Sequence, residues 1–191
     1  MKSRWWLVIL TIISYALVYY RPMWSFQFLA PQYPDGLELQ VYMTGAQGDV
    51  TEIDIINHYI GMQKLEDAAK NERALAPYVL IFLSLLTVIV AIKPRHKLSK
   101  ILYLPIMGFP IAFVLIFYLW LYRFGHELNP AAPVKLIPFT PTILGTGIIG
   151  QFRTFALPGI GFYLACFSAI LTGLMLYYYN FRKNYESRKT T

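Results

Sequence analysis

The side chains best suited to chemistry gather in one polar stretch, residues 48–62. If this stretch forms a helix from Val50, then Asp54, His58 and Met62 fall at successive i, i+4 positions on one face. An imidazole and a thioether one turn apart are ligand types that copper accepts, and imidazole also suits zinc or haem iron. The spacing therefore indicates a metal site. The competing interpretation is that Met62 packs in a core while Asp54 and His58 hydrogen-bond to each other on a solvated face.

A second candidate ligand is His126, which is followed directly by a carboxylate, Glu127. The remaining histidine, His96, lies among basic residues and is interpreted as part of a positive surface. If His126 converges with His58 and Met62, the three side chains form a site of mixed hardness that suits copper, with nearby carboxylates orienting the rings. The sequence therefore predicts one metal site made of His58, Met62 and His126, and copper as its metal.

The elements that would position this site are a helix and a strand. Asp49 with Glu52 three residues later is an acidic form of the capping box, which predicts that the helix starts at Val50. Upstream, residues 37–43 alternate apolar and polar side chains, as in a short strand with one buried face. No second run of matching pattern occurs in the chain. We therefore expect this strand to have an open edge, which could pair with another subunit.

The composition places these elements on a membrane protein. Of the 191 residues, 57% are hydrophobic and only 14% are charged, which is too apolar for an ordinary soluble domain. Four stretches are long enough to cross roughly 30 Å of hydrocarbon: residues 5–20, 78–92, 101–122 and 159–179. We therefore predict an all-α integral membrane protein with one domain over residues 1–191 and four transmembrane helices. A small outer α+β segment would occupy residues 21–76, and a long apolar outer loop residues 123–158.

Basic residues predict the orientation in the membrane. Ten of them fall on one side of the four-span path: Lys2, Arg4, Lys93, Arg95, Lys97, Lys100, Arg182, Lys183, Arg188 and Lys189. The positive-inside rule makes that side cytoplasmic, so both termini are expected inside and the protein in the cytoplasmic membrane. The net charge of +7 then describes topology and contact with anionic lipid rather than binding to nucleic acid. Residues 22–76 carry eight acids against three bases, so the outer face could attract cations.

Motifs for catalysis are missing from the sequence. It contains no phosphate-binding loop, CxxC or HExxH motif and no Ser-His-Asp pattern. The four predicted spans carry no charged residue between their ends to relay protons, and no histidine to ligate haem within the bilayer. The sequence therefore predicts a protein that is neither an enzyme nor a proton-driven transporter.

Three short runs resemble a known group of proteins: Ala30–Leu37, Gly48–Val50 and Asn57–Met62. They are similar to uncharacterised membrane proteins encoded beside nitrous-oxide reductase and its copper-delivery factors in some bacteria. The similarity covers mainly the first outer segment. It implies a copper-related or respiratory setting, in which His58 and Met62 occupy the matching positions.

Together these observations predict a membrane accessory protein that binds or passes copper at the outer face for a respiratory metalloenzyme. Its partners would be the lipid bilayer and other membrane or periplasmic subunits. The alternative is a structural subunit of a larger membrane complex, which makes contacts through its outer strand and apolar loop. A weaker third interpretation is a redox subunit that binds haem or quinol near His58 and His126.

Overall fold

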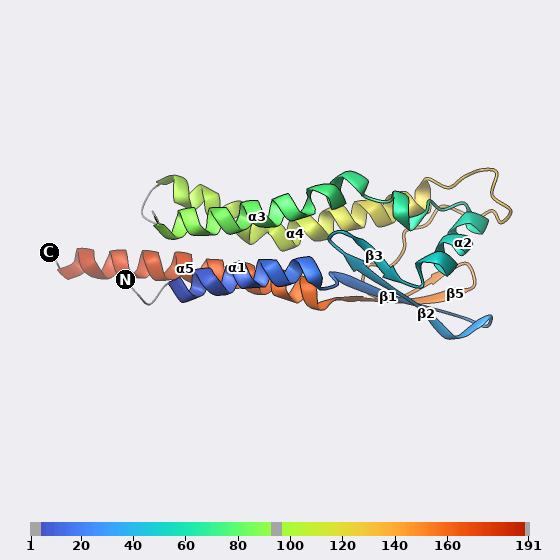
Figure 1. The fold of residues 1–191 in the computed structure, drawn as a ribbon, viewed down its shortest axis with the longest axis horizontal. Helices are drawn as coiled ribbons and strands as arrows, with labels where there is room; N and C mark the ends of the chain where they lie inside the picture. The colour runs from blue at the N-terminus through green and yellow to red at the C-terminus, as the bar shows by residue number, and fades with distance from the viewer. Residues whose placement is uncertain (1–4, 93–96, 190–191) are drawn as a thin grey trace.

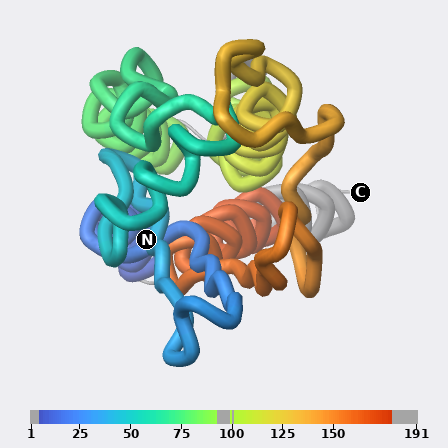
Figure 2. Tube along the Cα trace, turned by 90° about the vertical axis from the view of Figure 1, so that its right-hand side faces the viewer, coloured from blue at the N-terminus to red at the C-terminus, as the bar shows by residue number. Residues whose placement is uncertain are grey.

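The computed structural model describes residues 5–92 and 97–189, which form a helical stem and a headpiece at one end of it (Figure 1). The stem consists of four helices: α1 (Trp5–Tyr20), α3 (Lys70–Ile92), α4 (Lys97–His126) and α5 (Ile160–Lys189). Each packs mainly against two others, in the cyclic order α1, α5, α4, α3, as the view along the stem shows (Figure 2). The first turn of α1 and the last turn of α5 lie at the end away from the headpiece (Figure 1).

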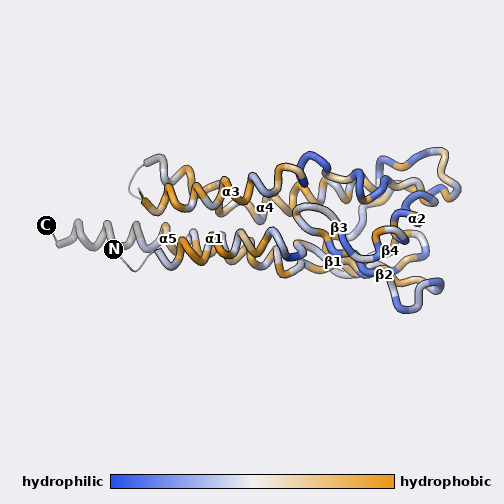
Figure 3. Tube along the Cα trace, viewed as in Figure 1, coloured by the Kyte–Doolittle hydropathy of each residue, from blue (hydrophilic) through white to orange (hydrophobic). Residues whose placement is uncertain are grey.

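The stem has the length and composition of a membrane domain. Three of its helices are long and apolar enough to cross a membrane, over Lys70–Ile92, Ile101–His126 and Ile160–Tyr178, whereas Trp5–Tyr20 is a shorter apolar helix. Apolar residues dominate the stem and polar ones the headpiece (Figure 3). Large apolar side chains such as Ile81, Leu104 and Ile111 are mostly exposed on the outside of the helices. Such a surface is stable against lipid rather than water, so this is a membrane protein.

The orientation of the stem rests on side chains outside the described part of the structure. Of the ten basic residues counted above, Lys2, Arg4, Lys93 and Arg95 lie outside the described residues, as does His96, and the side chains of the other six are not described. The predicted cytoplasmic location of both termini therefore stays a prediction.

The headpiece is built on a five-stranded antiparallel sheet, so the prediction of an all-α fold is wrong and the chain is α+β. The strands are β1 (Trp24–Ala30), β2 (Tyr33–Tyr42), β3 (Gly45–Gly48), β4 (Gly145–Ile149) and β5 (Phe152–Pro158), in the spatial order β3-β2-β1-β5-β4. The first three come from the predicted outer segment. The last two come from residues 123–158, which are therefore not one long loop but end in a hairpin.

The strand predicted to be alone has partners on both sides within this chain. It is part of β2, which pairs with β1 through Phe26 opposite Leu39 and with β3 through Gln40 opposite Gln47. The expectation of an open edge at this strand is therefore wrong. The open edges of the sheet are those of β3 and β4.

One face of the sheet packs against helices. Trp24 and Phe26 of β1, Leu39 of β2 and Ala156 of β5 are buried, and Phe117 of α4 packs against them. The headpiece helix α2 (Val50–Ile60) covers part of the same face through its buried Ile53. The Trp24 indole Nε1 also donates a hydrogen bond of 2.7 Å to the backbone oxygen of Ile143, just before β4. Apolar burial therefore joins both outer segments to α4.

The sheet continues directly into the stem without a flexible linker. The backbone N–H of Gly159, after β5, donates to the oxygen of Met23, and that of Gly161 donates to the oxygen of Pro22. A Cβ at Gly159 would collide with the Pro22 carbonyl, so only glycine allows the two chain segments to approach this closely. The start of β1 and the start of α5 are thus fixed to each other, which sets the position of the headpiece on the stem.

Candidate functional site

The helix predicted to carry the metal ligands begins at Val50, as expected, but it ends before Met62. The last helical residue of α2 is Ile60, and Gly61 follows in the left-handed conformation with φ 81°. The N–H of Met62 then returns to the Asn57 oxygen at 2.8 Å, which is a helix-terminating bond. Met62 therefore does not continue the face of α2 that carries His58.

The predicted capping box is wrong. Asp49 makes no side-chain bond to the first turn of α2. Its carboxylate Oδ2 instead accepts the backbone N–H of Glu38 at 2.7 Å, and its own N–H donates to the Glu38 oxygen at 2.8 Å. Because β3 delivers Asp49 beside β2, the side chain completes the edge of the strand and ties the start of α2 to the sheet.

Asp54 also has a structural role that the sequence did not indicate. Its Oδ1 accepts the backbone N–H of Leu65 at 2.7 Å, at the start of the short helix η2 (Leu65–Asp67). The proposed hydrogen bond between Asp54 and His58 is therefore replaced by a bond across the α2–α3 connection. His58 itself is exposed, with its ring centroid 6.3 Å from that of Tyr59.

The other histidine lies at the end of α4. His126 is exposed and stacks on Tyr122, with 3.8 Å between ring centroids and 15° between ring planes. Its Nδ1 lies 2.9 Å from the Tyr122 backbone oxygen. The neighbouring Glu127 accepts hydrogen bonds of 3.0 Å from both Arg123 and Gln63.

These bonds bring the two histidine-bearing segments side by side. Besides the Gln63–Glu127 bond, the Asn129 N–H donates to the Gly61 oxygen at 2.8 Å and the Val134 N–H to the Tyr59 oxygen at 3.0 Å. The contact is thus made by backbone and by an amide, beside the histidines rather than through them. Within residues 5–92 and 97–189, no group of three or more His, Cys, Asp or Glu side chains is placed to hold a metal. The site of His58, Met62 and His126 stays a prediction.

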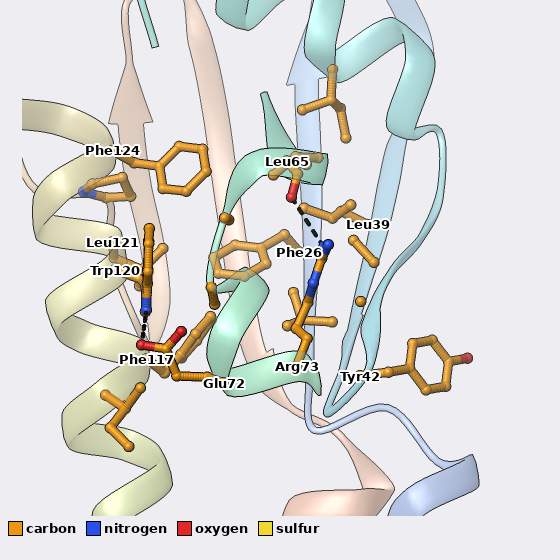
Figure 4. Close-up of a pocket in the computed structure, with 18 of the residues that line it drawn as sticks. Phe26, Leu39, Tyr42, Leu65, Glu72, Arg73, Phe117, Trp120, Leu121 and Phe124 are labelled. Carbon is orange, nitrogen blue, oxygen red and sulfur yellow. Dashed lines mark hydrogen bonds between the residues drawn. The ribbon is translucent and has the colours of Figure 1, made fainter. Parts of the chain in front are cut away.

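A different feature dominates the interior of the headpiece, namely an apolar cavity of about 420 Å³ between the sheet, α2 and the adjoining parts of α3 and α4 (Figure 4). One wall is a stripe of α4 at helical spacing: Phe109, Phe113, Phe117, Leu121 and Phe124. The opposite wall is the inner face of the sheet, including Phe26, Leu39, Val41 and Phe152. Cavities of this size with mostly apolar walls and a few polar groups are typical of sites for small apolar ligands.

The cavity reaches the surface between α3 and α4. Five of its lining residues are also exposed, with Leu75 exposed by 56%: Glu72, Leu75 and Val79 on α3, and Ala112 and Ile116 on α4. On the headpiece side of these residues, the Trp120 indole N–H donates to the Glu72 carboxylate at 3.3 Å, and this hydrogen bond joins the two helices (Figure 4). The opening therefore has apolar sides, and the Trp120–Glu72 hydrogen bond closes its headpiece end.

The cationic group in the cavity wall is Arg73, on the first turn of α3. In Figure 4 its side chain extends away from Glu72 and toward Leu65. The guanidinium donates to the backbone oxygens of Leu65 at 3.4 Å and Glu66 at 2.8 Å. No carboxylate of the described residues lies within 4.0 Å of it.

Sequence reasoning did not find this cavity. Its α4 wall is an aromatic stripe with i, i+4 spacing, and such a stripe inside a predicted span is indistinguishable from ordinary helix packing. Met62, predicted as a metal ligand, proves to be one of the lining residues. Comparison with known proteins adds no assignment, since neither a family model nor a curated protein matches the sequence.

Proposed function

We propose that this protein binds a hydrocarbon chain from the surrounding bilayer in the headpiece cavity. The observation that carries the proposal is the apolar space of about 420 Å³, whose exposed rim residues lie on two membrane helices. A chain that moves from lipid into this space removes no apolar surface from water, so the hydrophobic effect does not favour its binding. Dispersion contacts with the aromatic side chains of the wall have to supply the binding free energy. The phenylalanine stripe of α4 supplies those contacts. The protein acts here as a binding protein and not as an enzyme.

The membrane setting of the proposal has four spans. We include α1 as the fourth, since it lies along α5 and its Ser14 hydroxyl donates to the Leu164 oxygen of α5 at 2.9 Å. Its 16 residues are short for the hydrocarbon thickness, which the neighbouring helices and local thinning of the bilayer would accommodate. The positive-inside rule then places the headpiece on the outer face of a cytoplasmic membrane.

Copper handling for a respiratory enzyme is a second candidate function. The observation that favours it is the contact between residues 59–63 and residues 127–134, which brings the backbone beside His58 close to that beside His126. The ligands proposed for copper are His58, Met62 and His126. A structural subunit of a larger membrane complex is a separate alternative, which the open sheet edges at β3 and β4 favour.

A photocrosslinking experiment tests chain binding. Purified protein in nanodiscs that contain a phospholipid with a diazirine in one acyl chain is irradiated, and the labelled residues are mapped by mass spectrometry. We expect adducts on buried cavity residues such as Phe26 and Leu39 in addition to lipid-facing residues such as Leu104. Labels on lipid-facing residues alone would overturn the proposal.

Two matched variants separate the cavity from general lipid contact. Ala112 lines the cavity on α4, so Ala112→Trp should remove the cavity adducts by filling the space. Leu115 lies on the same helix, is 60% exposed and is not a lining residue, so Leu115→Trp should leave them unchanged. Equal labelling of the cavity in both variants would contradict the proposed function.

A further inference from the structure

We infer that the ligand is an anionic amphiphile, with one acyl chain in the cavity and a phosphate or carboxylate head group held by Arg73. The inference rests on the proposed function and adds the chemical class of the ligand. It comes from the position of one guanidinium in a mostly apolar wall, whose carboxylate, that of Glu72, accepts the Trp120 indole N–H.

The charge of Arg73 is not neutralised by the residues around it. Two of its nitrogens donate to carbonyl oxygens, at 2.8 and 3.4 Å, which satisfies donors without supplying a negative charge. In the described part of the chain no ion pair involves Arg73. A guanidinium presents five N–H donors in a planar fork, so donors remain for the oxygens of an anion.

The acids nearest in sequence are engaged elsewhere. Glu72 accepts the Trp120 indole N–H, and Asp67 pairs with Lys70 at 2.7 Å. The pKa of Asp67 is lowered, chiefly by the hydrogen bond and charge of Lys70 and to a lesser extent by the charges of Lys64 and Arg73. Asp67 therefore feels the field of Arg73 at a distance but does not pair with it, and the guanidinium can accept an external anion.

The position of Arg73 along the axis of the stem suits binding of a lipid head group. It lies at the junction of the headpiece and the stem, because the apolar sequence of α3 begins within one turn of it. Figure 3 shows the chain becoming less apolar from the stem toward the headpiece. A lipid head group occupies this level of a bilayer, so a chain in the cavity can place its charged end beside Arg73 without leaving the membrane interface.

The test compares head groups on one chain composition. Native mass spectrometry measures how tightly detergent-purified protein retains phosphatidylglycerol and phosphatidylcholine with identical acyl chains, and a fatty acid as the carboxylate case. We expect the two anionic ligands to be preferred about tenfold over phosphatidylcholine, as for a charge-assisted hydrogen bond. Arg73→Gln should reduce that preference to about one, whereas Arg73→Lys should retain part of it.

The control variant is Lys70→Gln. It also removes one positive charge, one helical turn from Arg73, and Lys70 is an exposed residue that already pairs with Asp67. It should leave the preference unchanged. Equal loss in Lys70→Gln and Arg73→Gln would overturn the role of Arg73 by showing that only the general surface charge matters. Glycerol phosphate, which has no acyl chain, should not displace the bound lipid. If it did, the inference that the ligand is an amphiphile would be overturned.

The outcomes also separate this inference from the proposed function. If wild-type protein binds phosphatidylglycerol and phosphatidylcholine equally, and Ala112→Trp abolishes binding of both, the cavity site stands and the head-group inference fails. If neither lipid is retained by the wild type and no cavity adduct forms, the proposed function itself fails.

Discussion

Single residues fix the contact between the two outer segments. Gly61 combines a left-handed backbone with a close neighbour, because a Cβ there would lie 2.9 Å from the Asn129 backbone oxygen. This glycine ends α2 and at the same time accepts the N–H of Asn129 through its own oxygen. The same position therefore determines where His58 and Met62 point and how residues 129–134 pack beside them.

We predict that Gly61→Ala destabilises the headpiece by about 1–3 kcal/mol, from backbone strain together with the contact at Asn129. Gly145→Ala is the matched control, since Gly145 has the same φ of 81° but open space where a Cβ would be. Thermal unfolding in detergent, followed by circular dichroism, should show a smaller loss for Gly145→Ala. Equal losses would mean that the Asn129 contact contributes nothing.

The copper hypothesis is also decided at this scale. His58→Ala should abolish stoichiometric copper without changing the helical content, because the exposed ring contributes little to packing. Met62→Leu should weaken Cu(I) much more than Zn(II), since a thioether matters mainly for the soft ion. Metal analysis of the purified variants measures both effects. Copper content that is independent of His58 would exclude the predicted site.

At the scale of elements, the apolar helices and α2 followed from the sequence, but of the five strands only β2 did. The spans follow from length and apolarity, and β2 from its alternation. In β5 two of the three exposed positions, Phe155 and Leu157, are apolar and only Arg153 is polar, so its alternation is hidden. Pro31 lies in the turn after β1 and Pro34 lies within β2, and both favour an extended segment over a paired strand. Pairing between segments more than 100 residues apart was therefore invisible.

The cavity was missed for a related reason. A helix stripe such as Phe113 and Phe117 predicts that something packs on it, but spacing alone does not say whether that is a side chain or a ligand. Asp49 and Asp54 were misassigned because local patterns suggested a cap and a helix face. In the structure both carboxylates accept backbone N–H groups of distant segments.

The register of the sheet can be tested by disulfides in a Cys166→Ser background. Gln27 of β1 lies directly opposite Phe155 of β5. Opposite Cα atoms in an antiparallel pair are about 4.5–5.5 Å apart, within the range for a disulfide. Gln27→Cys with Phe155→Cys should therefore crosslink on mild oxidation, as peptide mapping would show. Gln27→Cys with Leu157→Cys is offset by two residues and should crosslink poorly; the reverse result would disprove the pairing.

At the scale of the whole molecule, the headpiece and the stem form one unit in which α4 belongs to both. Its 30 residues run from the stem into the headpiece, where its aromatic stripe becomes a wall of the cavity. The backbone hydrogen bonds of Gly159 and Gly161 join the start of α5 to the start of β1. A cavity bounded by both parts therefore lies where the apolar stem meets the headpiece, as a consequence of the architecture.

Topology follows from the same arrangement. Reporter fusions at Gln47 and Ala132 should both report the outside, because both positions lie in or beside the headpiece, and a fusion after Thr191 should report the cytoplasm. Alkaline phosphatase and green fluorescent protein are complementary reporters for the two sides. Opposite locations for Gln47 and Ala132 would contradict the fold, whereas a cytoplasmic location of both would reverse the orientation.

The central claim is that the headpiece cavity holds a hydrocarbon chain. The measurement that tests it most directly is a crystal structure grown from a lipidic mesophase that contains phosphatidylglycerol. The account predicts one elongated density among the lining side chains of the sheet, α2, α3 and α4, ending near the Arg73 guanidinium. A cavity that is empty, or filled only by separate water molecules, would contradict it.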